Sequence, residues 1–193
     1  MAENSFKIGS LALAVLANAL LIGYAFAAYQ DTEAWQAATR FTARISLFIF
    51  ALLFVRRTLR KNKTDQELYL LSALAVSHLI HLYFLLKFNH LKGGLEWNIR
   101  LLGGITAYAF MIAIPLLGFT HRLTPPSFER FKTIGMYVIW FVMAGTYVPR
   151  ILGNKNHAGG TPAEFYLGFG LMIGLMLFHL YVRISARNKT GFF

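Results

Sequence analysis

Two histidines in one apolar stretch are the residues of this 193-residue chain best suited to chemistry. His78 and His81 lie in a Ser-His-Leu-Ile-His run at residues 77–81. Their i, i+3 spacing places both imidazoles on one face of a helix, one turn apart. Burying two polar rings among apolar residues costs free energy unless each ring finds a partner. The pair therefore indicates either a ligand site or hydrogen bonds that hold neighbouring helices together.

A third histidine and one arginine complete the candidate site residues. His179 lies alone in another apolar run, where a structural role competes with ligand binding. Arg44 lies about one turn beyond Arg40, toward the interior of its apolar segment. A charge there either extends outward to the membrane interface or meets an anion, such as a lipid phosphate or the carboxylate of a cofactor.

Other kinds of chemistry are excluded by composition. The chain has no cysteine, which removes disulfides, thiolate-bound metals and cysteine nucleophiles. All eight acidic residues fall in tails, loops or the ends of apolar segments, so carboxylate proton relays inside a membrane are not expected. The net charge of +11 comes with 56% hydrophobic and only 14% charged residues. These basic residues mark helix ends at a membrane surface more simply than they mark a nucleic-acid interface.

The elements that must position these residues are membrane helices. A bilayer core needs roughly 20 apolar residues in a helix. Long apolar stretches that meet this requirement predict six spans, at about 8–30, 35–55, 68–86, 101–120, 133–149 and 165–182. No stretch alternates strictly between apolar and polar residues, which argues against a barrel. We therefore expect an all-α integral membrane protein, a six-transmembrane-helix bundle that forms a single transmembrane domain over residues 1–193.

Basic residues predict the orientation of this bundle. An N-in/C-in arrangement places 12 of the 19 lysines and arginines inside. These are Lys7, Arg56, Arg57, Arg60, Lys61, Lys63, Arg122, Arg130, Lys132, Arg183, Arg187 and Lys189. The first span has small residues near its end that resemble a signal-peptide cleavage site. Its apolar run is longer than a usual signal core, so we expect a retained anchor, in a bacterial inner membrane.

Two segments carry a resemblance to a known family. One is the TARISL stretch at 42–47, followed by Arg56 and Arg57, and the other is 70–83 with the histidine pair. Together they resemble the second and third helices of the ferric reductase-like transmembrane family. That family includes the haem-binding membrane subunit of the methionine sulfoxide reductase system. The resemblance covers roughly residues 40–150, and it implies that His81 is a haem ligand, His78 a second-site or pocket residue, and Arg44 a contact of haem propionate.

The fifth span departs from the family pattern. The FERFKTIG stretch at 128–135 is similar to a family segment that normally ends in Leu-His, and Lys132 stands at the histidine position. A second family histidine normally follows about four turns later, near Gly145 and Thr146 in this chain. Both expected ligands of this helix are missing. His179 could substitute only at a similar depth, yet a rise of about 1.5 Å per residue places it roughly 10 to 15 Å from the depth of His81.

The resemblance implies a haem b-binding membrane electron-transfer module, the membrane subunit of an oxidoreductase with no catalytic domain of its own. Because no flavin or nicotinamide domain is present, electrons are expected from a redox partner protein or a quinol. The missing fifth-span histidines support an alternative, a haem-less accessory or assembly protein that keeps the scaffold. A transporter is a third reading, which the absence of acidic residues within the spans disfavours.

Overall fold

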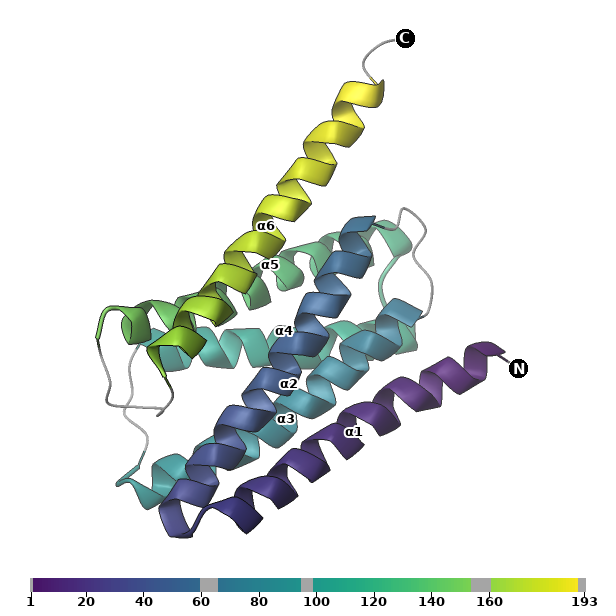
Figure 1. Cartoon of the computed structure of the whole chain (residues 1–193). Coiled ribbons are helices and arrows are strands. Elements are labelled where there is room, and N and C mark those ends of the chain that lie inside the picture. Colours follow the sequence, from purple (N-terminus) through teal and green to yellow (C-terminus); the bar gives the residue numbers. More distant parts are fainter. Residues whose placement is uncertain (1, 60–65, 95–98, 154–160, 191–193) are drawn as a thin grey trace.

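A computed structural model describes residues 2–59, 66–94, 99–153 and 161–190 of the chain, with side chains described for 9–59, 66–94, 101–153 and 161–186. These residues form six helices (Figure 1): α1 (Ala2–Ala28), α2 (Asp31–Leu59), α3 (Gln66–Leu91), α4 (Ile99–Thr120), α5 (Pro125–Ile151) and α6 (Pro162–Thr190). All six are long and apolar enough to cross a membrane, and the described residues contain no strand. The prediction of an all-helical bundle with six membrane-spanning helices is confirmed.

Each helix overlaps its predicted span, but several helix ends lie outside it, by up to eight residues at the start of α5 and the end of α6. The first span was predicted to reach Gln30, but α1 ends at Ala28 and α2 begins at Asp31, whose φ of 46° makes the turn abrupt. Proline at the start of α5 suits the first turn of a helix, where its missing N–H costs nothing. Of the basic residues that predict the orientation, Arg60, Lys61 and Lys63 lie outside the described residues. The side chains of Lys7, Arg187 and Lys189 also lie outside the described part of the chain.

Helices α2 and α3 form the centre of the bundle. Helix α1 packs against both of them, α4 packs against α3 and α5, and α6 packs against α5 and α2 (Figure 1). Half of the most apolar part of α2 is buried within the protein, compared with 17% for α1. The outer surfaces remain apolar, with exposed side chains such as Phe48, Phe141 and Leu167. Such a surface is what contact with lipid requires.

A chain of hydrogen bonds holds the three N-terminal helices together. Asn18 of α1 donates from Nδ2 to the hydroxyl of Ser77 on α3, at 3.0 Å. The Ser77 hydroxyl lies 3.0 Å from that of Ser46 on α2, which donates to the carbonyl of Thr42. Asn18, Ser46, Thr42 and Ser77 have no exposed surface. Hydrogen bonds between such polar residues are a common means of fixing helices to each other in membranes.

Helix α6 runs parallel to α2 but is displaced along it. Glu164 near the start of α6 contacts Arg44 in the middle of α2, and His179 contacts Thr58 near the end of α2. The last turns of α6 therefore extend beyond the end of α2, as Figure 1 shows. The start of α6 lies beside the region of α2 that contacts the histidine pair.

Candidate functional site

His81 is held by α2 through one ring nitrogen. Its Nδ1 lies 3.0 Å from the backbone carbonyl oxygen of Thr39 and 3.3 Å from the Thr42 hydroxyl. The Thr42 hydroxyl also lies close to carbonyls of its own helix, at 2.9 and 3.1 Å. The ring is half-buried between α3 and α2.

This contact determines the tautomer of His81. A carbonyl oxygen can only accept a hydrogen bond, so Nδ1 carries the hydrogen. In a neutral imidazole the other nitrogen, Nε2, is then unprotonated and presents a lone pair. Histidines that ligate metals characteristically donate from the non-ligating nitrogen to a carbonyl or carboxylate in this way. The ring is chemically prepared to bind a metal ion or to accept a proton through Nε2.

His78 and Tyr108 place two further polar groups beside His81. The ring centroids of His78 and His81 are 5.2 Å apart, and those of His78 and Tyr108 of α4 are 4.7 Å apart. Nδ1 of His78 and the hydroxyl of Tyr108 are both buried and have no hydrogen-bond partner in the described part of the protein. Leaving such a group unsatisfied costs about 1–3 kcal/mol. The cluster therefore has unmet hydrogen-bonding capacity that a ligand could use.

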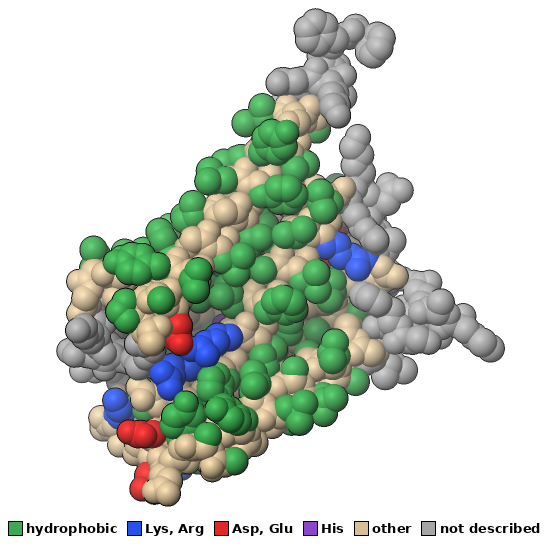
Figure 2. Space-filling view, in the orientation of Figure 1, with side chains coloured by type: hydrophobic (Ala, Val, Ile, Leu, Met, Phe, Trp, Pro, Cys, Tyr) green, Lys and Arg blue, Asp and Glu red, His purple; other side chains and the backbone are tan. Residues whose placement is uncertain are grey.

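Arg44 forms an ion pair within the protein. Its guanidinium lies 2.6 Å from the carboxylate of Glu164, and both side chains remain partly exposed. Arg150 of α5 stacks over the rings of Tyr147 and Phe165, at 5.9 and 5.6 Å. Figure 2 shows basic side chains gathered beside an acidic one, with apolar side chains around them.

Arg150 belongs to the same charged group as Arg44, because its guanidinium stacks over Phe165, the residue that follows Glu164. Tyr147 itself packs closely on α6, because a Cβ atom at Gly168 would lie only 2.4 Å from its ring. The candidate site and the charged group beside it are therefore formed by residues of α2, α3, α4, α5 and α6.

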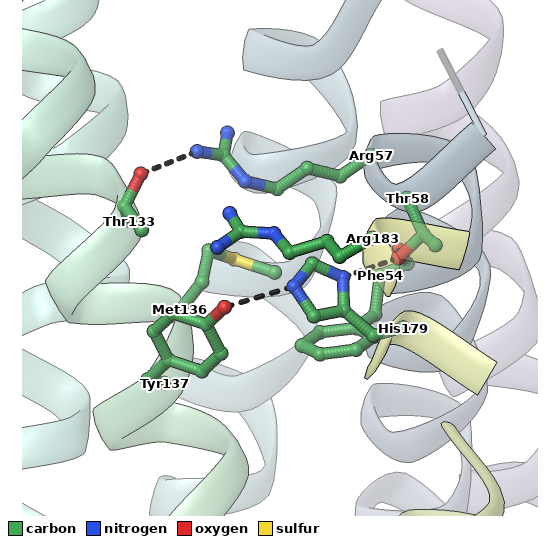
Figure 3. A pocket seen from close by; sticks show the side chains of 8 residues that line it. All are labelled: Phe54, Arg57, Thr58, Thr133, Met136, Tyr137, His179 and Arg183. Atoms are coloured by element: carbon green, nitrogen blue, oxygen red, sulfur yellow. Dashed lines mark hydrogen bonds between the residues drawn. The ribbon is translucent and has the colours of Figure 1, made fainter. Parts of the chain in front are cut away.

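His179 lies in a different part of the bundle, and both of its nitrogens are engaged (Figure 3). Nδ1 lies 2.9 Å from the hydroxyl of Thr58, and Nε2 lies 2.8 Å from the hydroxyl of Tyr137. Thr58 donates its only hydroxyl hydrogen to the carbonyl of Phe54, so it accepts from Nδ1 of His179. Nε2 then accepts from Tyr137, and neither nitrogen of this ring is left for another ligand.

Of the four predicted site residues, the structure brings His78, His81 and Arg44 to one region and separates His179 from them. The α2 partners of His81 and His179 are Thr42 and Thr58, which are 16 residues apart. That spacing corresponds to about 24 Å along a helix. The separation exceeds the 10 to 15 Å expected from the sequence, because α6 is displaced along α2.

Several contributing residues carried no clear signal in the sequence. Tyr108, Tyr147 and Arg150 are distant from the histidine pair along the chain and reach it only through packing. Glu67 and Lys132, near the starts of α3 and α5, form a buried ion pair with 2.9 Å between the amino nitrogen and a carboxylate oxygen. Lys132 stands where the resembled family carries a histidine, and a lysine in that apolar stretch is a sequence signal for a buried acidic partner.

No group of three or more histidine, aspartate or glutamate side chains that could hold a metal ion is found in the described part of the chain. Comparison with protein-family models, with curated proteins and with solved structures finds no match.

Proposed function

We propose that this protein is a haem b-binding membrane electron-transfer module, with His81 as the iron ligand through Nε2. The observation that supports this most is the hydrogen bond from Nδ1 of His81 to the Thr39 carbonyl, which leaves Nε2 unprotonated. Bound haem would supply one-electron redox chemistry at its iron. The residues around His81 would hold the group and exclude water from it.

The surrounding groups fit the polar edge of a haem. Arg44 and Arg150 are cations at the border of the site, and propionate carboxylates are the anions they would pair with. Arg44 would exchange or share its contact with Glu164. The unsatisfied Nδ1 of His78 and hydroxyl of Tyr108 are hydrogen-bonding groups next to the iron ligand. His78 would be a pocket residue, since it shares a helix face with His81 and cannot bind the opposite side of one iron.

In this proposal His179 would not hold the iron. Its nitrogens are bound to Thr58 and Tyr137, about 24 Å along α2 from the contact of His81. We therefore propose iron with one histidine ligand.

The orientation and partners are part of the same proposal. Arg57 at the end of α2 and Arg183 near the end of α6, both predicted to lie inside, line one cavity together with Thr133 near the start of α5. This distribution supports an N-in/C-in bundle in a bacterial inner membrane. A quinol or a redox partner protein would donate the electrons, and the chain would act as the membrane subunit of an oxidoreductase.

The haem content of the purified protein tests this function. The full chain is expressed with ample haem supply, and the haem-to-protein ratio is measured by the pyridine haemochrome method. We expect about one haem per chain, less than a tenth of that in His81→Ala, and an unchanged ratio in His179→Ala. A wild-type ratio near zero, or equal ratios in His81→Ala and the wild type, would reject the proposal.

The alternative function is a haem-less accessory or assembly protein on the same scaffold. The position of Lys132 favours it, because the amino group contacts Glu67 and Glu129 at 2.9 and 2.8 Å and is nearly fully buried. A structural ion pair thus occupies a place where the resembled family normally carries a haem ligand. Absence of haem from a stable, folded wild-type protein would support this alternative.

A further inference from the structure

A second site, independent of the proposed haem function, lies where α2, α5 and α6 meet beyond His179. It is a small cavity of about 10 Å³, room for roughly one water molecule or one ligand oxygen. Figure 3 shows its lining side chains, among them Arg57 from α2, Thr133 and Tyr137 from α5, and His179 and Arg183 from α6. The cavity opens at the end of the bundle where these basic residues gather.

The floor of the cavity is fixed. His179 is held on both sides by Thr58 and Tyr137, and its ring packs 5.4 Å from the ring of Phe54. These contacts give the imidazole a neutral, structural role. The charged group left to meet a ligand is the guanidinium of Arg183, since Arg57 is engaged by Glu67 and Thr133.

The charges at the mouth do not balance. Arg57 and Lys132 are offset by Glu67 and Glu129, which they contact at 2.6 to 3.6 Å. Arg183 adds a third cation, and no acidic side chain in the described part of the chain pairs with it. Figure 3 shows Arg57 and Arg183 extending in the same direction toward α5. Because Glu67, Glu129 and Thr133 already engage Arg57, Arg183 is the cation beside the cavity that is left to meet an anion.

An apolar surface adjoins the cavity. Leu177, Leu180 and Tyr181 of α6 are 61%, 46% and 69% exposed, within two turns before Arg183. These side chains lie between Arg183 and the start of α6, on the side of Arg183 toward the membrane core in the proposed orientation. A ligand with an anionic head and an apolar tail would satisfy both surfaces at once.

We propose that this cavity binds the phosphate group of an anionic phospholipid. One phosphate oxygen enters the cavity, Arg183 contacts the head, and the acyl chains lie along α6 toward its start. The ligand supplies the negative charge that the cluster lacks. It also fixes the displaced end of α6 to α2 and α5.

Native mass spectrometry of the full chain in detergent tests this site, with phosphatidylglycerol, phosphatidylcholine and inorganic phosphate as separate probes. We expect phosphatidylglycerol to bind more tightly than phosphatidylcholine. Because a charge-assisted hydrogen bond is lost, Arg183→Gln should weaken phosphatidylglycerol binding by about tenfold. Arg130→Gln is the matched control, since Arg130 is exposed on α5 and does not line the cavity.

Wild-type affinity for phosphatidylglycerol in Arg183→Gln would overturn the proposal, as would equal binding of the two lipids. Binding of inorganic phosphate that Arg183→Gln abolishes, without a preference for phosphatidylglycerol, would overturn the lipid assignment and give the cavity to free phosphate. Arg183 is exposed and forms no ion pair among the described residues, so its substitution leaves the fold intact.

Discussion

The Nδ1 nitrogen of His81 lies 3.0 Å from the backbone carbonyl oxygen of Thr39, across the interface between α3 and α2. Because the carbonyl cannot donate, the hydrogen of the neutral ring is placed on Nδ1 and the lone pair on Nε2. His179 has the same tautomer, with its hydrogen on Nδ1 facing Thr58, but the lone pair of its Nε2 is already used by the hydroxyl of Tyr137. Two histidines in similar apolar helices therefore differ in their capacity to bind a metal.

The buried ion pair between Glu67 and Lys132 should contribute strongly to stability. The side chain of Lys132 is 3% exposed and that of Glu67 is 9% exposed. Lys132→Met removes the cation between Glu67 and Glu129 but leaves Glu67 in contact with Arg57, so it is expected to lower the free energy of unfolding by about 3 kcal/mol, the lower part of the range for breaking a buried ion pair. Unfolding of the purified protein with SDS in mixed micelles measures this change.

The double variant Glu67→Gln/Lys132→Met is expected to recover part of that loss, because both charges are then removed. Arg122→Gln is the control, since Arg122 is an exposed cation in the loop before α5. A Lys132→Met variant as stable as Arg122→Gln would contradict the prediction.

The hydroxyl of Ser77 joins α3 to α1 and α2, and its removal should loosen that contact. Ser77→Ala is expected to cost about 0.6–2 kcal/mol, the range measured for hydrogen bonds between membrane helices. Ser72→Ala is a matched control on the same helix, because the Ser72 hydroxyl bonds only to the Leu68 carbonyl of its own helix among the contacts described. Equal unfolding free energies for the two variants would show that the network does not hold the helices together.

Close packing of α5 on α4 depends on Gly135. A Cβ atom there would lie 2.7 Å from side-chain atoms of Ile114 and Phe110. Gly135→Ala is therefore expected to destabilise the protein by about 1–3 kcal/mol through overpacking. Gly145→Ala on the same helix meets nothing within 4 Å, and should stabilise it by up to about 1 kcal/mol through higher helix propensity. Thermal unfolding followed by tryptophan fluorescence distinguishes the pair, and a stabilising effect at both positions would contradict the packing described.

The helices were predictable because membrane spans are set by local composition. The six apolar stretches all became helices, but several helices extend beyond the predicted spans, since α5 begins at Pro125 rather than at 133 and α6 ends at Thr190 rather than at 182. The one-turn separation of His78 and His81 follows from helix geometry alone, and their ring centroids are 5.2 Å apart.

The partners of the candidate residues were not predictable in the same way. The contacts of Arg44 with Glu164 and of His179 with Thr58 depend on how far α6 is displaced along α2. That displacement results from packing between helices, including the close approach of Tyr147 to Gly168. Apolar periodicity fixes where a helix lies in the sequence, but it does not fix the axial position of one helix against another.

The visible absorption spectrum of the detergent-purified protein, first oxidised and then reduced with dithionite, tests the central claim most directly. The proposal predicts a Soret band that shifts on reduction in the wild type and in His179→Ala, and that is lost in His81→Ala. A featureless spectrum from protein produced with ample haem would contradict it, and so would a Soret band that persists in His81→Ala.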